Sequence, residues 1–278
     1  MTNSAAYPMS PRRVMLVFLA LAALLLLVVA FRMAIGGLPD DDLLREVLLS
    51  RLARVRSCVI VGVALATSGV ALQVLLRNPL AEPFILGLST GAGVGVIAQS
   101  VLAWWLYQQV GPSHLGALLG AAASMLIVYA AARRRGVIDP LGLLLVGVVL
   151  STINGALIML LNYVAGPGGV KEQLSLWMMG YISESVDAVS IWLVAAVTGG
   201  GLGLLLYLAG AMDVATFSDT EAQSLGVNLT RLRTTLFLVA SVLAAGAVVL
   251  AGPIAFVGLV SPHLTRLLIG PSHRTLLV

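Results

Sequence analysis

The sequence has 278 residues, of which 59% are hydrophobic and only 10% are charged. Because soluble domains carry roughly a quarter charged residues, this composition excludes a soluble globular protein and indicates a chain that crosses a membrane several times. The net charge of +4 is expected from arginines in the loops between spans, so it does not indicate nucleic-acid binding. The only lysine, Lys171, follows Val170 rather than glycine, which excludes a Walker-type nucleotide-binding loop.

Apolar segments predict an all-α polytopic membrane helix bundle of about eight spans, because a helix needs about 20 apolar residues to cross a bilayer. Breaks rich in glycine and proline, as at 111–114 and 166–169, divide them. The first run could instead be a cleaved signal peptide, but it is long for one and no small-residue cleavage site follows. The single cysteine, Cys58, is expected to be a small buried side chain. The predicted spans are 13–35, 57–77, 84–107, 114–133, 141–164, 189–212, 234–252 and 254–270.

Positive charge favours a cytoplasmic N-terminus. In that orientation ten arginines fall inside and six positive residues outside, as the positive-inside rule requires. Much of the outside charge lies between Arg45 and Arg56, just ahead of the second span. Within it Arg51 and Arg54 are three residues apart and share one face if the helix begins there. Such guanidinium groups suit carboxylates on a docking protein, with snorkelling at a helix end as the alternative.

The stretch from Arg77 to Gly95, RNPLAEPFILGLSTGAGVG, joins the second and third spans. Asn78, Pro79 and Pro83 are expected to end any helix that enters it, because proline lacks the N–H and disfavours helix in the residue before it. The sequence therefore predicts a non-helical joint at a membrane face. The part of this stretch up to its first glycine, residues 77–87, is called the 77–87 joint below.

Small residues follow this joint. Gly87 and Gly91 help to give the third span a face that another helix backbone can approach closely, and small residues four apart at 91/95, 116/120 and 199/203 predict close helix packing. Gly87-Leu-Ser89-Thr-Gly91 also matches the G-x-S-x-G pattern of a serine nucleophile. That motif needs a preceding strand and partner His and Asp residues, so we favour packing or a translocation path over an intramembrane hydrolase.

Residues 213–233 form a polar island between the sixth and seventh spans. Ser218 to Glu221 is a capping-box pattern that begins a helix, and Gly226 can end that helix after two turns. Asn228 can cap a second helix that leads into the seventh span. Two short helices on the cytoplasmic side would make a rigid foot able to transmit motion from a soluble partner, with an ordinary interfacial helix as the alternative.

Two further features are expected to lie inside the helix bundle. Gly252 and Pro253 break the seventh span from the eighth, and non-helical backbone at membrane depth survives only inside protein or beside a cavity. Asn154 and Asn162 make the fifth span unusually polar, which indicates either interhelical hydrogen bonds or a water-filled path. His263 has no companions at ligand spacing, so no metal site or cofactor is predicted.

Several stretches together carry a family likeness: Arg51-Leu-Ala-Arg54, Ser68-Gly69, Arg77-Asn-Pro-Leu-Ala-Glu-Pro83, Trp177-Met-Met-Gly180, Glu221-Ala-Gln-Ser-Leu-Gly226, Gly252-Pro-Ile-Ala-Phe-Val-Gly-Leu259, Pro262-His263-Leu264 and His273-Arg274. In these the chain resembles the FecCD family, the permeases of type II ABC importers for ferric siderophores, haem and vitamin B12. The likeness runs from the first span to the last residue. Family members resemble ten-helix proteins, whereas this sequence stops at Val278 after about eight spans.

The resemblance implies roles for particular residues. Arg51 and Arg54 would meet acidic residues of a periplasmic or lipoprotein binding protein. The segment from Phe217 to Leu229 would form coupling helices on an ABC ATPase, through Phe217, Ser218, Glu221, Ala222, Leu225, Gly226, Val227 and Asn228. The translocation path or helix packing would involve Gly87, Ser89, Gly91, Asn154, Asn162, Gly252 and Pro253.

We therefore predict a non-enzymatic permease in the inner (cytoplasmic) membrane, moving an iron–siderophore complex, or haem or vitamin B12, by alternating access. Two ATPase copies, a binding protein, a second permease and membrane lipid would be its partners, with no nucleic acid. The alternatives are a truncated, non-transporting fragment of such a permease and an ATPase-independent secondary transporter. The latter predicts a buried charge within a span for ion coupling.

Overall fold

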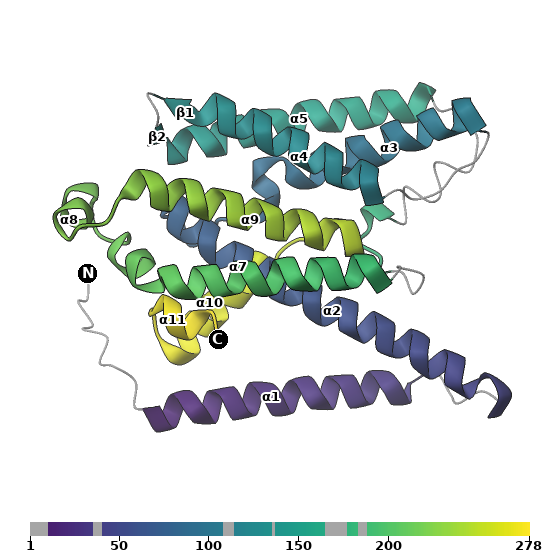
Figure 1. Ribbon diagram of the computed structural model, residues 1–278, viewed down its shortest axis with the longest axis horizontal. Coiled ribbons are helices and arrows are strands. Elements are labelled where there is room, and N and C mark those ends of the chain that lie inside the picture. The colour runs from purple at the N-terminus through teal and green to yellow at the C-terminus, as the bar shows by residue number, and fades with distance from the viewer. Residues whose placement is uncertain (1–10, 36–40, 108–113, 135–136, 165–176, 183–187) are drawn as a thin grey trace.

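The computed structural model describes residues 11–35, 41–107, 114–134, 137–164, 177–182 and 188–278. These form a helical bundle, which confirms the predicted fold class (Figure 1). The predicted breaks at 111–113 and 166–169, and Lys171, lie outside the described residues. The helices are α1 (Pro11–Ala34), α2 (Asp41–Leu76), the 3-10 helix η1 (Pro83–Leu86), α3 (Leu88–Tyr107), α4 (His114–Ala132), α5 (Pro140–Val164), α7 (Ala188–Val214), α8 (Asp219–Ser224), α9 (Leu229–Ala251), α10 (Val257–Ile269) and α11 (His273–Leu276).

Within the described ranges, six helices are long and apolar enough to cross a membrane: α1, α2, α4, α5, α7 and α9. Shorter apolar helices occupy 88–103 and 257–269. The long helices lie roughly along one direction in Figure 1, so the bundle has two ends. The end with α8 and the short strands β1 (Arg133–Arg134) and β2 (Val137–Ile138) lies opposite the end where α2 begins.

Helix α2 crosses the bundle and packs most extensively on α9. The Ser68 hydroxyl donates to the Ala240 carbonyl across this contact, 2.7 Å away and fully buried. Gly69 meets α10 at Gly258, where a β-carbon on Gly69 would collide with the Gly258 backbone. Backbones this close require glycine, so this crossing brings α10 into direct backbone contact with α2.

Glycine pairs bring α3 and α4 together as predicted. A β-carbon on Gly95 or Gly120 would collide with the Gly116 or Gly91 carbonyl of the facing helix. At the third predicted pair, 199 and 203, nothing described lies within 4 Å of a β-carbon built at either position, so close packing there stays a prediction. Spacing alone therefore does not reveal whether a glycine face meets a helix or open surface.

Three local features differ from what the sequence suggested. Helix α2 begins at Asp41, so the arginine-rich segment treated as a polar loop continues the second span as helix. Residues 133–134 and 137–138 form the antiparallel strands β1 (Arg133–Arg134) and β2 (Val137–Ile138), which the composition did not indicate. Cys58 is exposed rather than buried, because its face of α2 lines a groove toward α1.

Candidate functional site

The predicted arginine pair lies at the end where α2 begins, and its two members have different surroundings. Arg51 is 6% exposed, and its guanidinium donates to the Met33 carbonyl of α1 at 2.7 Å. Arg54 is half-buried and lies over the Tyr181 ring, with 5.7 Å between guanidinium carbon and ring centroid. It also donates to the Tyr181 hydroxyl at 3.3 Å. Arg51 therefore fixes α1, while Arg54 sits nearer the surface.

At the opposite end, residues 213–233 fold as the sequence suggests. Ser218 caps α8, accepting the Glu221 N–H, while the Glu221 carboxylate accepts the Ser218 N–H at 3.0 Å and its hydroxyl at 2.6 Å. These bonds stabilise the ionised form, so the Ser218 hydroxyl and N–H lower the pKa of the Glu221 carboxyl. Gly226 has a φ of +85°, and the Asn228 side chain accepts the Arg231 N–H to cap α9.

The surface of this foot is apolar at two points. Phe217 and Leu225 are 54% and 62% exposed, whereas Ala222 between them is buried against the rest of the chain. Val227 is half-buried. Exposed large apolar side chains on a rigid, capped turn are typical of a surface that a protein partner covers.

Asp219, in the first turn of α8, joins three elements. Its carboxylate accepts two hydrogen bonds from the Arg233 guanidinium of α9, at 2.9 and 3.0 Å. The Arg77 guanidinium lies 2.6 Å from the same carboxylate. Arg77 also donates from Nε to the Ala215 carbonyl at 3.2 Å, and its φ is +48°, which L residues rarely adopt.

The 77–87 joint leaves α2 and turns back into the bundle. Pro83 lies beside Gly258 of α10, and Gly87, with a φ of +77°, lies beside Gly147 of α5. Glu82 in this joint is only 9% exposed, and its carboxylate accepts the Phe256 N–H at 2.6 Å. A buried carboxylate within the bundle is costly, so such residues commonly have a function.

Sequence reasoning missed Glu82. It falls between the predicted spans 57–77 and 84–107, so the sequence does not mark it as a charge within a span. The available signal was its position: it is the only carboxylate between Glu46 and Asp139, and two prolines flank it at 79 and 83.

The break between α9 and α10 is where the sequence predicts it. Gly252 has a φ of +67°, and a β-carbon there would collide with the Trp177 carbonyl. Pro253 lies beside Gly180, whose β-carbon would stand 2.8 Å from the Pro253 carbonyl. Phe256 begins α10 with a φ of +68°. The Trp177–Gly180 segment thus covers the break and lets non-helical backbone lie inside protein.

Asn154 makes interhelical hydrogen bonds. It is 6% exposed, and its amide donates to the Thr90 and Ser124 hydroxyls, both at 3.2 Å. Ser89 and Asn162 are half-buried. Ser124 also lies where a β-carbon on Gly91 would collide with it. This geometry favours the packing interpretation of Asn154 over the water-filled path.

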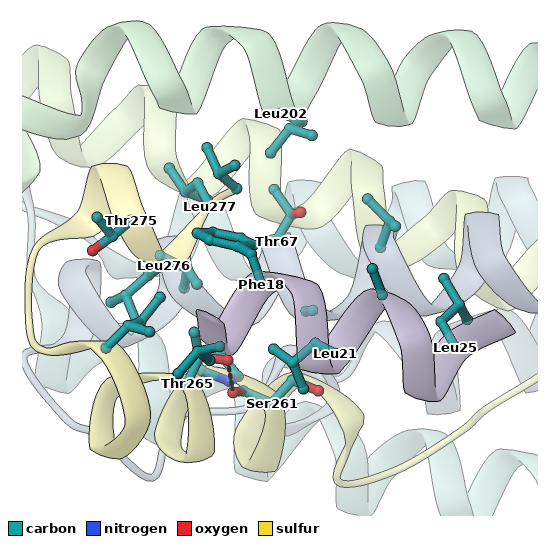
Figure 2. Close-up of a pocket in the computed structure, with 18 residues that line it drawn as sticks. Phe18, Leu21, Leu25, Thr67, Leu202, Ser261, Thr265, Thr275, Leu276 and Leu277 are labelled. Carbon is teal, nitrogen blue, oxygen red and sulfur yellow. Dashed lines mark hydrogen bonds between the residues drawn. The ribbon is translucent and has the colours of Figure 1, made fainter. Parts of the chain in front are cut away.

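A cavity of about 420 Å³ separates α1 from α2, α10 and α11. In Figure 2, Phe18 of α1 lies among Leu276, Leu277 and Thr67, and Leu21 lies beside Ser261. The described residues that line this cavity carry no charged side chain. Among the described residues no group of three or more His, Cys, Asp or Glu could hold a metal ion.

The comparisons with known proteins agree with this architecture. The model of the FecCD transport family matches residues 14–278. A solved structure described as an inward-facing conformation of a metal-chelate type ABC transporter superposes with a TM-score of 0.81 and 28% sequence identity, covering 94% of this chain and 84% of that one.

Three similar curated proteins are named for different substrates. The cobalamin import system permease BtuC of Halobacterium salinarum is 39% identical over 228 residues, 82% of this chain and 60% of the relative. The hemin transport system permease HmuU of Yersinia pestis is 35% identical over 273 residues, 95% and 79% respectively. The Fe(3+)-citrate import system permease YfmD of Bacillus subtilis is 36% identical over 233 residues, 82% and 66%. The chain thus spans less than two thirds of the first and third of these relatives.

Proposed function

The chain belongs to the FecCD transport family, and we propose that it is a transmembrane permease subunit of an ABC importer. The observation that carries this proposal is the pairing of two features at opposite ends of one bundle. One end has the arginine-bearing start of α2, and the other has the capped foot of residues 213–233 with exposed Phe217 and Leu225.

The foot would contact a separate ABC ATPase, since the chain has no Walker-type loop of its own. Its short helix α8 is capped at its start by Ser218, and the following helix α9 is capped by Asn228, so a push on Phe217 or Leu225 moves the foot as a body. Two ATPase copies and a second permease, identical or related, would complete the transporter. This places the foot and the N-terminus on the cytoplasmic side of the inner membrane.

At the other end, Arg54 would meet a carboxylate of a substrate-binding protein, because its guanidinium lies near the surface and its aromatic contact holds it in place. Arg51 would support it by fixing α1 through the Met33 carbonyl. The substrate class is a metal chelate: cobalamin, hemin and ferric citrate are named for the relatives. We favour a ferric siderophore-type chelate over hemin and cobalamin as the substrate of this chain.

A secondary transporter is the alternative that Glu82 favours, because ion-coupled transport uses a charged side chain buried within the bundle. Uptake into proteoliposomes separates the two. Labelled ferric citrate, hemin or cobalamin should accumulate only when the ATPase, the binding protein and ATP are all present. Accumulation driven by a proton gradient without ATP would contradict the ABC proposal.

A further inference from the structure

We propose that two carboxylates, Asp219 of α8 and Glu82 of the 77–87 joint, are the positioning residues that pass motion from the foot to the break ahead of α10. The inference rests on the proposed function, because it assumes that an ATPase moves α8. Each carboxylate would transmit movement through the hydrogen-bond donors that it binds.

The first link is the shared carboxylate of Asp219. Arg233 binds both of its oxygens, which ties α8 to the start of α9, and Arg77 binds one of them, which ties α8 to the end of α2. Charge-assisted contacts to two guanidinium groups are directional and strong relative to neutral hydrogen bonds. A displacement of α8 therefore pulls on Arg77, the first residue of the joint.

The second link is the joint itself, which is short and internally bonded. The Ala81 N–H donates to the Asn78 carbonyl at 3.0 Å, and the Leu80 N–H donates to the Asn78 side chain at 2.9 Å. Pro79 fixes a further φ angle. Arg77 holds a left-handed conformation while its guanidinium bonds Asp219 and Ala215. The joint is therefore stiff enough to move as one piece when Arg77 moves.

The third link is Glu82. Its carboxylate accepts the N–H of Phe256, which caps α10 in a left-handed conformation. Negative charge is favourable at the N-terminus of a helix, so Glu82 both satisfies this backbone donor and attracts α10. Gly252, four residues before Phe256, also has a positive φ. The backbone between α9 and α10 is therefore non-helical and can bend without breaking a helix. Movement of Glu82 would thus tilt α10 against α2.

Distances between spin labels test each link separately. In a Cys58→Ser background, Leu225→Cys reports on α8 and Leu267→Cys on α10, and each is paired with Leu126→Cys on α4; these leucines are 62%, 71% and 65% exposed. The probe is Mg²⁺ with a non-hydrolysable ATP analogue, added to the complex with the ATPase subunits in nanodiscs. In the wild-type background both the 126–225 and the 126–267 distances should shift with nucleotide.

Asp219→Asn removes the negative charge while keeping the size and shape of the side chain nearly constant. The 126–225 shift should persist, because Phe217 still contacts the ATPase, while the 126–267 shift should be lost and uptake per ATP should fall about tenfold. Asp219→Glu keeps both ion pairs within reach and should restore much of each readout. Asp139→Asn is the matched control: it changes a nearby carboxylate that caps α5 through the Leu141 N–H, which asparagine also does.

Glu82→Ala tests the last link independently, because it removes the acceptor of the Phe256 N–H, and it too should abolish the α10 shift while leaving the α8 shift. A wild-type α10 shift in both Asp219→Asn and Glu82→Ala would overturn the inference while leaving the permease proposal intact. Loss of the α8 shift in Asp219→Asn would also overturn it, because the carboxylate would then hold the foot rather than relay its motion. Absence of any nucleotide-dependent shift in the wild type would instead count against the proposed function.

Discussion

Replacing Asn154 by alanine tests whether the polar fifth span stabilises the bundle or lines a path. The side chain donates to Thr90 and Ser124 at 3.2 Å from a site 6% exposed. Interhelical hydrogen bonds in membrane proteins contribute about 0.6 kcal/mol each on average. Two such bonds, with the small cavity that the truncation leaves, predict a loss of about 1–2 kcal/mol of unfolding free energy.

The assay is reversible unfolding in mixed micelles, with uptake measured in parallel. Asn162→Ala is the matched control, because that residue lies two turns along the same helix and is half-buried. It should change the unfolding free energy by less than about 0.5 kcal/mol. The reasoning fails if Asn154→Ala unfolds like the wild type but transports poorly, since that pattern belongs to a path residue.

Three other predictions concern the two ends. Gly226→Leu should lower ATP-coupled uptake, because the φ of +85° costs a leucine about 1–2 kcal/mol although its β-carbon meets nothing; full uptake would contradict a coupling role. Arg54→Glu should weaken binding-protein docking in a pull-down by more than the exposed Arg56→Glu does, and equal effects would remove Arg54 from the docking surface. The pKa of Glu221 is lowered on folding, so its stabilisation of α8 is present above the ordinary pKa of 4.5 and is lost as pH falls through the lowered value. The amide protection factors across 219–224 should therefore fall with acidification in the wild type, and by less in Ser218→Ala, which keeps only the backbone bond.

The broad fold was predictable because hydropathy and breaking residues act locally. Apolar runs of span length become helices wherever the backbone must satisfy its own hydrogen bonds. The same logic located the break at Gly252 and both caps of the foot, since Ser218 and Asn228 bond within three residues of themselves. Features determined by nearest neighbours in the chain are the ones that a sequence displays.

Features that depend on distant contacts were not predictable. Whether Arg51 faces a partner or the chain is decided by α1, whose Met33 carbonyl lies eighteen positions away. Glu82 became significant only when the structure placed Phe256 beside it, 174 positions later. The helical start of α2 at Asp41 was hidden because hydropathy detects apolar runs and is blind to a helix that continues into a charged segment.

The roles of the glycines divide in the same way. The sequence marked the glycines at 91/95, 116/120 and 199/203 alike, but only the first two pairs face one another. Gly69, in the crossing of α2 with α10, carried no comparable spacing signal, although a β-carbon there would collide with Gly258. Close approach is a property of two helices, so one helix alone cannot reveal it.

The most direct test of the account is the side of the membrane that each end faces. In a Cys58→Ser background, single cysteines replace Tyr181, beside Arg54, and Leu225, on the foot; these residues are 54% and 62% exposed. A membrane-impermeant maleimide added to spheroplasts should label the cysteine at 181 at once and the one at 225 only after lysis. Labelling of both positions in intact spheroplasts, or of neither, would contradict a permease with a docking rim outside and an ATPase-facing foot inside.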